Sequence, residues 1–300
     1  MTAAMDVLVG TAAGVIDAGT GRVVALDGED VGALAGRWAV VNGRRLVGLD
    51  GPAADGQVRD GRALEGGRIT CVDARPGDEP IVGTAEAHLY RMGAEPSLVE
   101  AFDRAETRSQ WYTPWGGPAD VRSVCTAPSG AILVNVHVGG ILRSDDDGER
   151  WRATIDLDHD VHQVLALDDL AVAACAHGFA ASHDDGLTWD IHDEGLHATY
   201  SRAVAVAGDT VLLSVSSGPQ GHRAAVYRRP LHTDDPFERC RTGLPDWFDG
   251  NVDTFWLAGA ADGSAALATW AGNVYVSTDE GTTWEQAASA VPSVRCVALA

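Results

Sequence analysis

The chain contains no lysine, because all 22 of its basic residues are arginine. Schiff-base enzymes, pyridoxal-phosphate enzymes and P-loop nucleotide-binding proteins each need a lysine ammonium group, so these three classes are excluded. The basic residues are also outnumbered by 43 Asp and Glu, which gives a formal net charge of −21. Since this charge repels phosphate backbones and anionic lipid surfaces, the sequence disfavours nucleic acid and membranes as partners.

Targeting and cross-linking signals are also scarce. No apolar run approaches the roughly 18 residues of a membrane span, and the first residues lack the cationic start of a secretory signal. The cysteines are odd in number, widely spaced and without a Cys-x-x-Cys motif, which argues against a disulfide framework; they are Cys71, Cys125, Cys175, Cys240 and Cys296. We therefore expect a cytoplasmic protein.

Catalytic signatures are missing as well. The sequence has no Gly-x-Ser-x-Gly elbow, no glycine-rich phosphate loop, no dinucleotide fingerprint and no His-Glu-x-x-His motif. Nothing in it points to a cofactor.

Short strand-like segments fill the chain instead. Apolar runs such as Ile132–Val136, Val211–Val215 and Ala265–Thr269 are bounded by Gly, Asp and Asn, and no amphipathic helical stretch interrupts them. The pattern predicts an all-β fold and calls for a search for internal repeats.

One motif, Ser-x-Asp-x-Gly-x-x-Trp, occurs three times, each time after an apolar run. In a tight turn its Asp can accept backbone N–H groups, its Gly can take a positive φ, and its Trp can pack beneath the turn. The copies are Ser144, Asp146, Gly148 and Trp151; Ser182, Asp184, Gly186 and Trp189; and Ser277, Asp279, Gly281 and Trp284.

These three segments resemble Asp-boxes, the BNR repeats of sialidase-like β-propellers. The resemblance implies four-stranded blades around a central channel, with the Asp-boxes as scaffold on one face and ligands bound on the other face. We call this second face, which carries the loops leading into the inner strands, the upper face.

A second pattern gives the number of blades. One polar residue followed by alternating apolar residues recurs seven times, at intervals of 31, 54, 40, 40, 51 and 42 residues. The mean, about 43 residues, fits four-stranded blades. The pattern starts at Arg37, Arg68, Arg122, His162, Arg202, Asp253 and Arg295.

We therefore predict a single seven-bladed β-propeller spanning residues 1–300. The last segment, Val294–Leu299, should pair with Val7–Gly10 and close the ring, which removes two exposed edges. Six blades remain an alternative, because the 31-residue interval is short and contains no Asp-box.

The second pattern also predicts a ligand site at the upper end of the channel. Five guanidinium groups gathered there could grip a carboxylate or phosphate, or they could be paired with neighbouring acids as scaffold. Aromatic residues in the adjoining loops could stack on sugars or serve as packing. The candidate ligand-binding residues are Arg37, Arg68, Arg122, His162, Arg202, Arg295, Trp111, Trp115 and Trp247.

An exo-sialidase is the main enzymatic alternative. The resemblance implies a three-arginine clamp, a Tyr/Glu nucleophile pair, an acid/base Asp and an early Phe/Tyr-Arg-Ile-Pro motif, which this chain lacks. The clamp would be Arg122, Arg202 and Arg295. The catalytic candidates are Tyr200 with Glu194, and Asp160 or Asp253.

A metal-dependent enzyme is a lower alternative, since several histidines fall on the predicted upper face. The candidate ligands are His137, His159, His162 and His177. The leading prediction is a monomeric binding protein, without a cofactor, that recognises a small anionic or carbohydrate-like ligand, or a protein or peptide.

Overall fold

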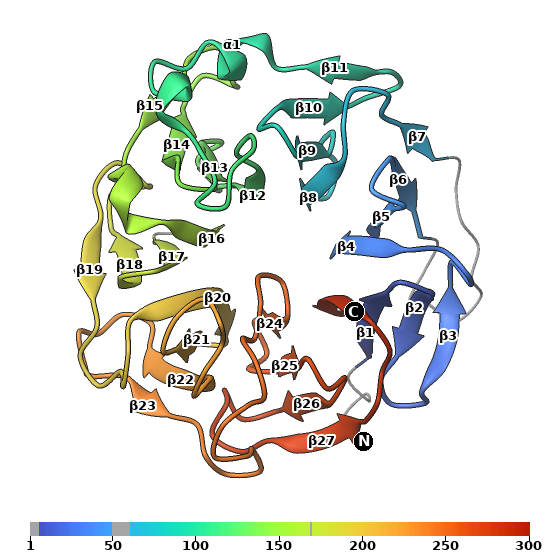
Figure 1. The fold of residues 1–300 in the computed structure, drawn as a ribbon, viewed down its shortest axis with the longest axis vertical. Coiled ribbons are helices and arrows are strands. Elements are labelled where there is room, and N and C mark those ends of the chain that lie inside the picture. The colour runs from blue at the N-terminus through green and yellow to red at the C-terminus, as the bar shows by residue number, and fades with distance from the viewer. Residues whose placement is uncertain (1–5, 50–60, 169) are drawn as a thin grey trace.

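The computed structural model describes residues 6–49, 61–168 and 170–300 and shows a ring of β-sheets around an open centre (Figure 1). The described residues form seven four-stranded antiparallel sheets. Helix is limited to three short segments: α1 (Glu100–Asp103), η1 (Arg108–Gln110) and η2 (Leu157–His159). The all-β class and the seven-bladed propeller are confirmed, and the six-bladed alternative is ruled out.

Each blade is numbered here in chain order and given from its inner to its outer strand. Blade 1 holds β28 (Val294–Leu299), β1 (Val7–Thr11), β2 (Gly14–Asp17) and β3 (Arg22–Ala25). Blade 2 holds β4 (Val31–Ala35), β5 (Trp38–Val41), β6 (Arg45–Gly48) and β7 (Arg62–Ala63). Blade 3 holds β8 (Ile69–Asp73), β9 (Ile81–Thr84), β10 (Leu89–Met92) and β11 (Pro96–Leu98).

The remaining blades follow the same order. Blade 4 holds β12 (Val121–Thr126), β13 (Ile132–Val136), β14 (Gly140–Ser144) and β15 (Arg152–Ala153). Blade 5 holds β16 (Val161–Ala166), β17 (Ala171–Cys175), β18 (Gly178–Ser182) and β19 (Asp190–His192). Blade 6 holds β20 (Tyr200–Ala207), β21 (Thr210–Ser216), β22 (Ala225–Pro230) and β23 (Glu238–Arg239), and blade 7 holds β24 (Leu257–Gly259), β25 (Ala265–Ala268), β26 (Val274–Ser277) and β27 (Glu285–Ala288).

The two ends of the chain close the ring, as predicted. β28 pairs antiparallel with β1, in a register that sets Val297 opposite Val9. The backbone N–H of Ala300 also donates to the carbonyl of Asp6 at 3.0 Å. β28 thus pairs with the edge that β1 would otherwise leave open.

The core lies between neighbouring blades. The second strands β13, β17, β21 and β25 are buried along their whole length, which matches their runs of Val, Leu and Ala. All five cysteines are unpaired. Burial raises the pKa of Cys71 and that of Cys296 to about 12, so these thiols behave as small apolar groups.

The three Ser-x-Asp-x-Gly-x-x-Trp segments form tight turns between the third and fourth strands of blades 4, 5 and 7. In the blade 7 turn, the Ser277 hydroxyl accepts the N–H of Gly281 at 2.9 Å and donates to Asp279 at 2.9 Å. The indole N–H of Trp284 donates to the Gly281 carbonyl at 3.0 Å. The same serine contacts recur in the other two turns, but Trp189 donates to the Thr154 hydroxyl instead.

The predicted position of Arg37 is wrong. The strand that follows it, β5, is the second strand of blade 2, and the inner strand is β4. Arg37 therefore sits in the turn between β4 and β5, at the end of the blade away from the upper face. At the position in β4 where the inner strands of blades 1, 4, 5 and 6 carry Arg or His, this blade carries Gly32, so the pattern selected the following strand.

No helix in the described part of the chain is long and apolar enough to cross a membrane.

Candidate functional site at the upper end of the channel

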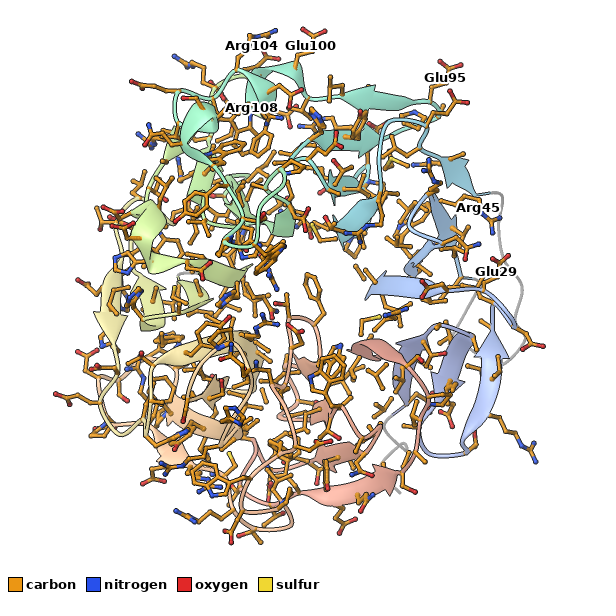
Figure 2. All side chains as sticks on the ribbon, viewed as in Figure 1. Glu29, Arg45, Glu95, Glu100, Arg104 and Arg108 are labelled. Carbon is orange, nitrogen blue, oxygen red and sulfur yellow. The ribbon has the colours of Figure 1, made fainter. Side chains whose placement is uncertain are left out.

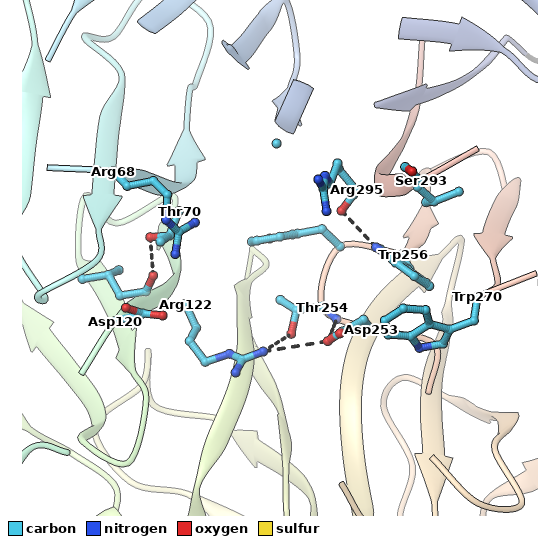
Figure 3. A pocket seen from close by; sticks show the side chains of 14 residues that line it. Arg68, Thr70, Asp120, Arg122, Asp253, Thr254, Trp256, Trp270, Ser293 and Arg295 are labelled. Atoms are coloured by element: carbon cyan, nitrogen blue, oxygen red, sulfur yellow. Dashed lines mark hydrogen bonds and ion pairs between the residues drawn. The ribbon is translucent and has the colours of Figure 1, made fainter. Parts of the chain in front are cut away.

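The upper end of the channel holds a cavity of about 470 Å³ (Figure 3). Its walls come from the inner strands, or the loops before them, of blades 1, 2, 3, 4 and 7. The lining residues are Gly32, Arg68, Thr70, Asp120, Val121, Arg122, Asp253, Thr254, Phe255, Trp256, Trp270, Ser293, Val294 and Arg295. The predicted upper-face pattern thus supplies four of the charged residues of this cavity: Arg68, Arg122, Asp253 and Arg295.

Asp253 is the shared acidic partner of two arginines beside the cavity. Arg202 Nη1 donates to both carboxylate oxygens, at 2.9 and 2.8 Å, and Arg122 Nη2 lies 3.8 Å from Oδ1. Arg122 also donates to the Thr254 hydroxyl at 3.2 Å. Burial lowers the pKa of Arg122 and Asp253 opposes this effect, so the carboxylate keeps both guanidinium groups charged.

The other two arginines of the cavity differ in their pairing. Arg295 Nε donates to Asp30 at 3.1 Å. Arg68 is exposed, and among the described residues its side chain has no ion pair or hydrogen bond. Burial raises the pKa of neighbouring Asp120, and the charges of Arg68 and Arg122 oppose the rise. Arg68 is thus the guanidinium most available to an incoming anion.

A buried His–Asp–His cluster lies next to Arg122. Asp160 is 3.7 Å from His137 Nε2 and 3.6 Å from His162 Nε2. Burial, followed by the charge of Arg122, lowers the pKa of His137 to about 4, and burial lowers the pKa of His162. Burial disfavours the charged form of Asp160, but the interaction with His162 outweighs it, so the pKa of Asp160 is lowered.

The cluster does not have the arrangement of a metal site. Across the described residues, no group of three or more His, Cys, Asp or Glu side chains is arranged to hold a metal ion. His162 Nδ1 is hydrogen-bonded to the Ser201 carbonyl at 2.6 Å, which turns Nε2 toward Asp160. The rings of His159 and His177 lie 6.0 Å apart and belong to no such group. The four histidine candidates are therefore not gathered into one ligand group within the described residues.

The predicted tyrosine–glutamate pair is not brought together. The Tyr200 hydroxyl lies 3.4 Å from Arg202 Nε and Nη2, and its ring lies against His162 with centroids 5.0 Å apart. Glu194 is exposed, and its carbonyl accepts the N–H of Phe237 just before the outer strand β23. Tyr200 thus starts an inner strand, whereas Glu194 is fixed to the outer part of blade 6.

The three predicted aromatic residues have different surroundings. Trp115 is 70% exposed and lies edge-on to His137, with centroids 4.7 Å apart. Trp111 packs on Phe102 beside blade 4. Trp247 lies under Arg239 at the outer strands of blade 6. Of these three residues, only Trp115 is close to the His–Asp–His cluster.

Other residues of the cavity were missed by the sequence analysis. Trp270 is 64% exposed on the wall, beside the buried Trp256 with centroids 5.5 Å apart. Asp30 and Asp120 provide acidic partners. Each lies just before an inner strand, at the position preceding Val31 or Val121, and this shared spacing is the signal that could have identified them.

Comparisons with known proteins show the fold and no family. No protein-family profile matches the chain, and no curated protein matches it. Among solved structures, "YCF48 bound to D1 peptide" has a TM-score of 0.58 at 17% identity and covers 94% of this chain and 84% of that one.

Two further solved structures agree. YCF48 from Cyanidioschyzon merolae has a TM-score of 0.57 at 16% identity and covers 83% of this chain and 80% of that one. The GH74 xyloglucanase from Xanthomonas campestris has a TM-score of 0.56 at 15% identity and covers 83% of this chain but only 43% of its own. At these identities the likeness extends to the β-propeller fold alone.

Proposed function

We propose that the chain is a binding protein whose upper cavity recognises an anionic group, carried by a peptide segment or by a small carbohydrate-like ligand. Arg68 is the observation that carries the proposal: it is an exposed guanidinium in the cavity wall without an ion pair among the described residues. In a chain with a net charge of −21, an exposed cation that forms no ion pair among the described residues favours an external anion, although the charge of Asp120 lies near it.

The rest of the cavity suits such a ligand. Its volume of about 470 Å³ lies within the usual range for ligand pockets. The exposed Trp270 supplies an aromatic face beside the charged groups, and Trp and Arg are the side chains most often found at binding hot spots. A peptide is the preferred carrier because a protein of the same fold, YCF48, is seen with a bound peptide.

Peptide selection tests the proposal. Random peptides displayed on phage would be selected on the whole chain, and the enriched sequences titrated by calorimetry against wild type, Arg68→Gln and Trp270→Ala. We expect acidic peptides, and a loss of affinity of about tenfold in each variant. Arg104→Gln, an exposed change on the outer rim (Figure 2), is the matched control. Peptides that bind all four proteins equally would refute the proposal.

The turns support a finer assignment of the fold. We infer that the three repeat turns are Asp-boxes, since each serine hydroxyl accepts its glycine N–H and donates to its aspartate. We further propose that the protein is a monomer and is cytoplasmic. The five unpaired thiols support the cytoplasmic location, because they fit a reducing compartment. Light scattering during size-exclusion chromatography measures the molar mass, which should be that of one chain.

A glycoside hydrolase of exo-sialidase type is the second candidate. It is favoured by one observation: Tyr200, Arg122 and Arg202 gather at the upper end of the channel with Asp253. Because Tyr200 contacts an arginine and not a carboxylate, it lacks the base that a tyrosine nucleophile needs. Release of fluorophore from a 4-methylumbelliferyl sialoside, abolished by Tyr200→Phe, would support the hydrolase over the binding protein.

A further inference from the structure

A second groove, of about 450 Å³, lies at the outer strands of blade 6, apart from the channel. It is formed by three segments: the loop after β19, the strands β22 and β23, and the chain that follows β23. Its lining is unusually basic for so acidic a chain and consists of Gly195, His197, Arg223, Tyr227, Glu238, Arg239, Arg241 and Trp247.

Local backbone contacts bring the three segments together. Gly195 has φ +84, and a Cβ there would lie 2.2 Å from the Phe237 carbonyl oxygen, so only glycine allows this close approach to β23. The N–H of Phe248 donates to the Ala224 carbonyl at 2.8 Å, which sets Trp247 beside Arg223. The groove is thus a fixed feature of the fold.

The aromatic residues hold two of the arginines in place. The guanidinium carbons of Arg239 and Arg223 lie 3.7 and 4.6 Å from the Trp247 ring centroid. His197 Nδ1 is bonded to the Tyr227 hydroxyl at 2.8 Å, and its ring stacks on that of Tyr227. Stacking fixes the guanidinium planes and leaves their N–H edges available for an oxyanion.

The charges in this groove are only partly balanced. Arg239 Nε and His197 Nε2 are buried without a hydrogen-bond partner. Arg241 has only a distant and exposed acidic neighbour, Asp246, at 3.9 Å. Burial, followed by the charge of Arg241, lowers the pKa of Arg239, so the cations destabilise one another. Among the lining residues, Glu238 offsets one of the three arginines and leaves two positive charges, which the exposed Asp246 outside the lining offsets only in part.

We propose that this groove is an anion site, distinct from the channel cavity, that binds the dianion of a phosphate monoester. Two excess positive charges match a dianion, and guanidinium forks match the geometry of phosphate oxygens. A carboxylate would neutralise only one of these charges. The phosphate can belong to a phosphorylated side chain of a protein or to a soluble phosphate ester.

Calorimetry with inorganic phosphate tests the site, and a phosphoserine peptide with its unphosphorylated form distinguishes the two sources. We expect saturable phosphate binding, weakened about tenfold or more by the double variant Arg223→Gln/Arg241→Gln. The double variant Arg104→Gln/Arg150→Gln removes the same charge from exposed ion pairs elsewhere and should bind as wild type does. If the phosphopeptide binds more tightly than inorganic phosphate, the source is a phosphorylated protein. If inorganic phosphate binds more tightly, the source is a soluble phosphate ester.

A second measurement is made on the wild-type chain, and a variant serves only to assign the signal. Burial, followed by the charge of Arg223, lowers the pKa of His197, so a bound dianion that offsets this charge should raise it. Nuclear magnetic resonance titration of His197, assigned with His197→Gln, would show the rise in the presence of phosphate. An unchanged His197 titration, equal losses in the two double variants, or tighter binding of acetate than of phosphate would each overturn the proposal.

Discussion

At the scale of single residues, the charge balance beside the upper cavity depends on Asp253. This carboxylate accepts two hydrogen bonds from Arg202 and lies within 3.8 Å of Arg122. Both arginine side chains are mostly buried. Their charges are therefore weakly solvated, and Asp253 supplies the compensation that water would otherwise give.

Replacing Asp253 with Asn should therefore destabilise the fold. The change leaves two partly buried guanidinium groups without a counter-charge, and we expect the free energy of unfolding to fall by about 2–3 kcal/mol. Urea denaturation measures it. The control is Glu100→Gln, which breaks the exposed ion pair with Arg104 (Figure 2) and should cost about 0.5 kcal/mol or less. Equal losses in the two variants would show that Asp253 has no special role.

The buried His137 predicts how stability depends on pH. Its pKa of about 4 in the folded protein lies below the unfolded value of about 6.5. The unfolded chain therefore binds a proton that the folded one excludes. This contribution to stability is fully present above pH 6.5 and is lost as the pH falls toward 4.

His137→Gln should flatten that dependence. Between pH 6.5 and 4, the variant's free energy of unfolding should fall less steeply than that of wild type, by up to about 1.4 kcal/mol per pH unit. Urea denaturation at several pH values gives the two curves, which should run parallel above pH 7. Parallel curves over the whole range would contradict the neutral state of His137.

The positions of the arginines could be predicted from the sequence more accurately than the acidic residues that pair with them. Arg122, Arg202 and Arg295 share one position of the inner-strand pattern, and Arg68 lies two positions earlier, just before β8. Local periodicity therefore predicted the upper end of the inner strand for all four. The partner of Arg295 is Asp30, 265 residues away. Such a pair depends on the closure of the ring, and no local pattern encodes it.

At the scale of elements, the repeat turn of blade 7 depends on glycine for two reasons. Gly281 has φ +76, and a Cβ there would lie 2.6 Å from Leu212 Cδ2 of blade 6. Leu212 is fully buried and has little room to move. The glycine thus allows both the turn and the packing of blade 7 on blade 6.

Two glycine substitutions separate these effects. Gly28 has φ +78, and a Cβ there would meet nothing within 4 Å. Gly28→Ala should therefore cost only the conformational strain, about 1 kcal/mol. Gly281→Ala should add the overlap with Leu212, for a total of about 2–4 kcal/mol. Thermal and urea denaturation measure both, and similar losses would show that the turn moves away from blade 6.

The start of an inner strand could be predicted only in blades that carry a polar side chain at that point. Blades with Arg or His at the start of the inner strand were placed correctly. Blade 2 was shifted by one strand, because Gly32 offers no side chain at that position and β5 alternates in the same way as an inner strand. The groove of blade 6 was missed for a similar reason, since Arg223, Arg239 and Trp247 meet only after β22 and β23 pair.

At the scale of the whole molecule, the propeller is held closed by one strand. β28 is the only strand of blade 1 that comes from the C-terminal end of the chain (Figure 1). It places the buried Cys296 and Val297 next to β1. Without β28, the inner edge of β1 would be unpaired. Blades 2 and 7 would also lose their contacts with the inner strand of blade 1.

A circular permutant tests whether closure needs this strand or the natural chain ends. The permutant joins Ala300 to Asp6 through a short glycine linker in place of residues 1–5, which is feasible because the two residues are hydrogen-bonded. New ends open between Asp234 and Asp235, in an exposed loop of blade 6, so that β23 becomes the closing strand. We expect cooperative unfolding in urea within about 2 kcal/mol of wild type, because every strand pair is kept.

A chain ending before Val294 should lose cooperative unfolding, since we expect the loss of β28 to exceed a typical stability of about 5–15 kcal/mol. Cooperative unfolding of the truncated chain at the wild-type midpoint would show that the ring does not need β28.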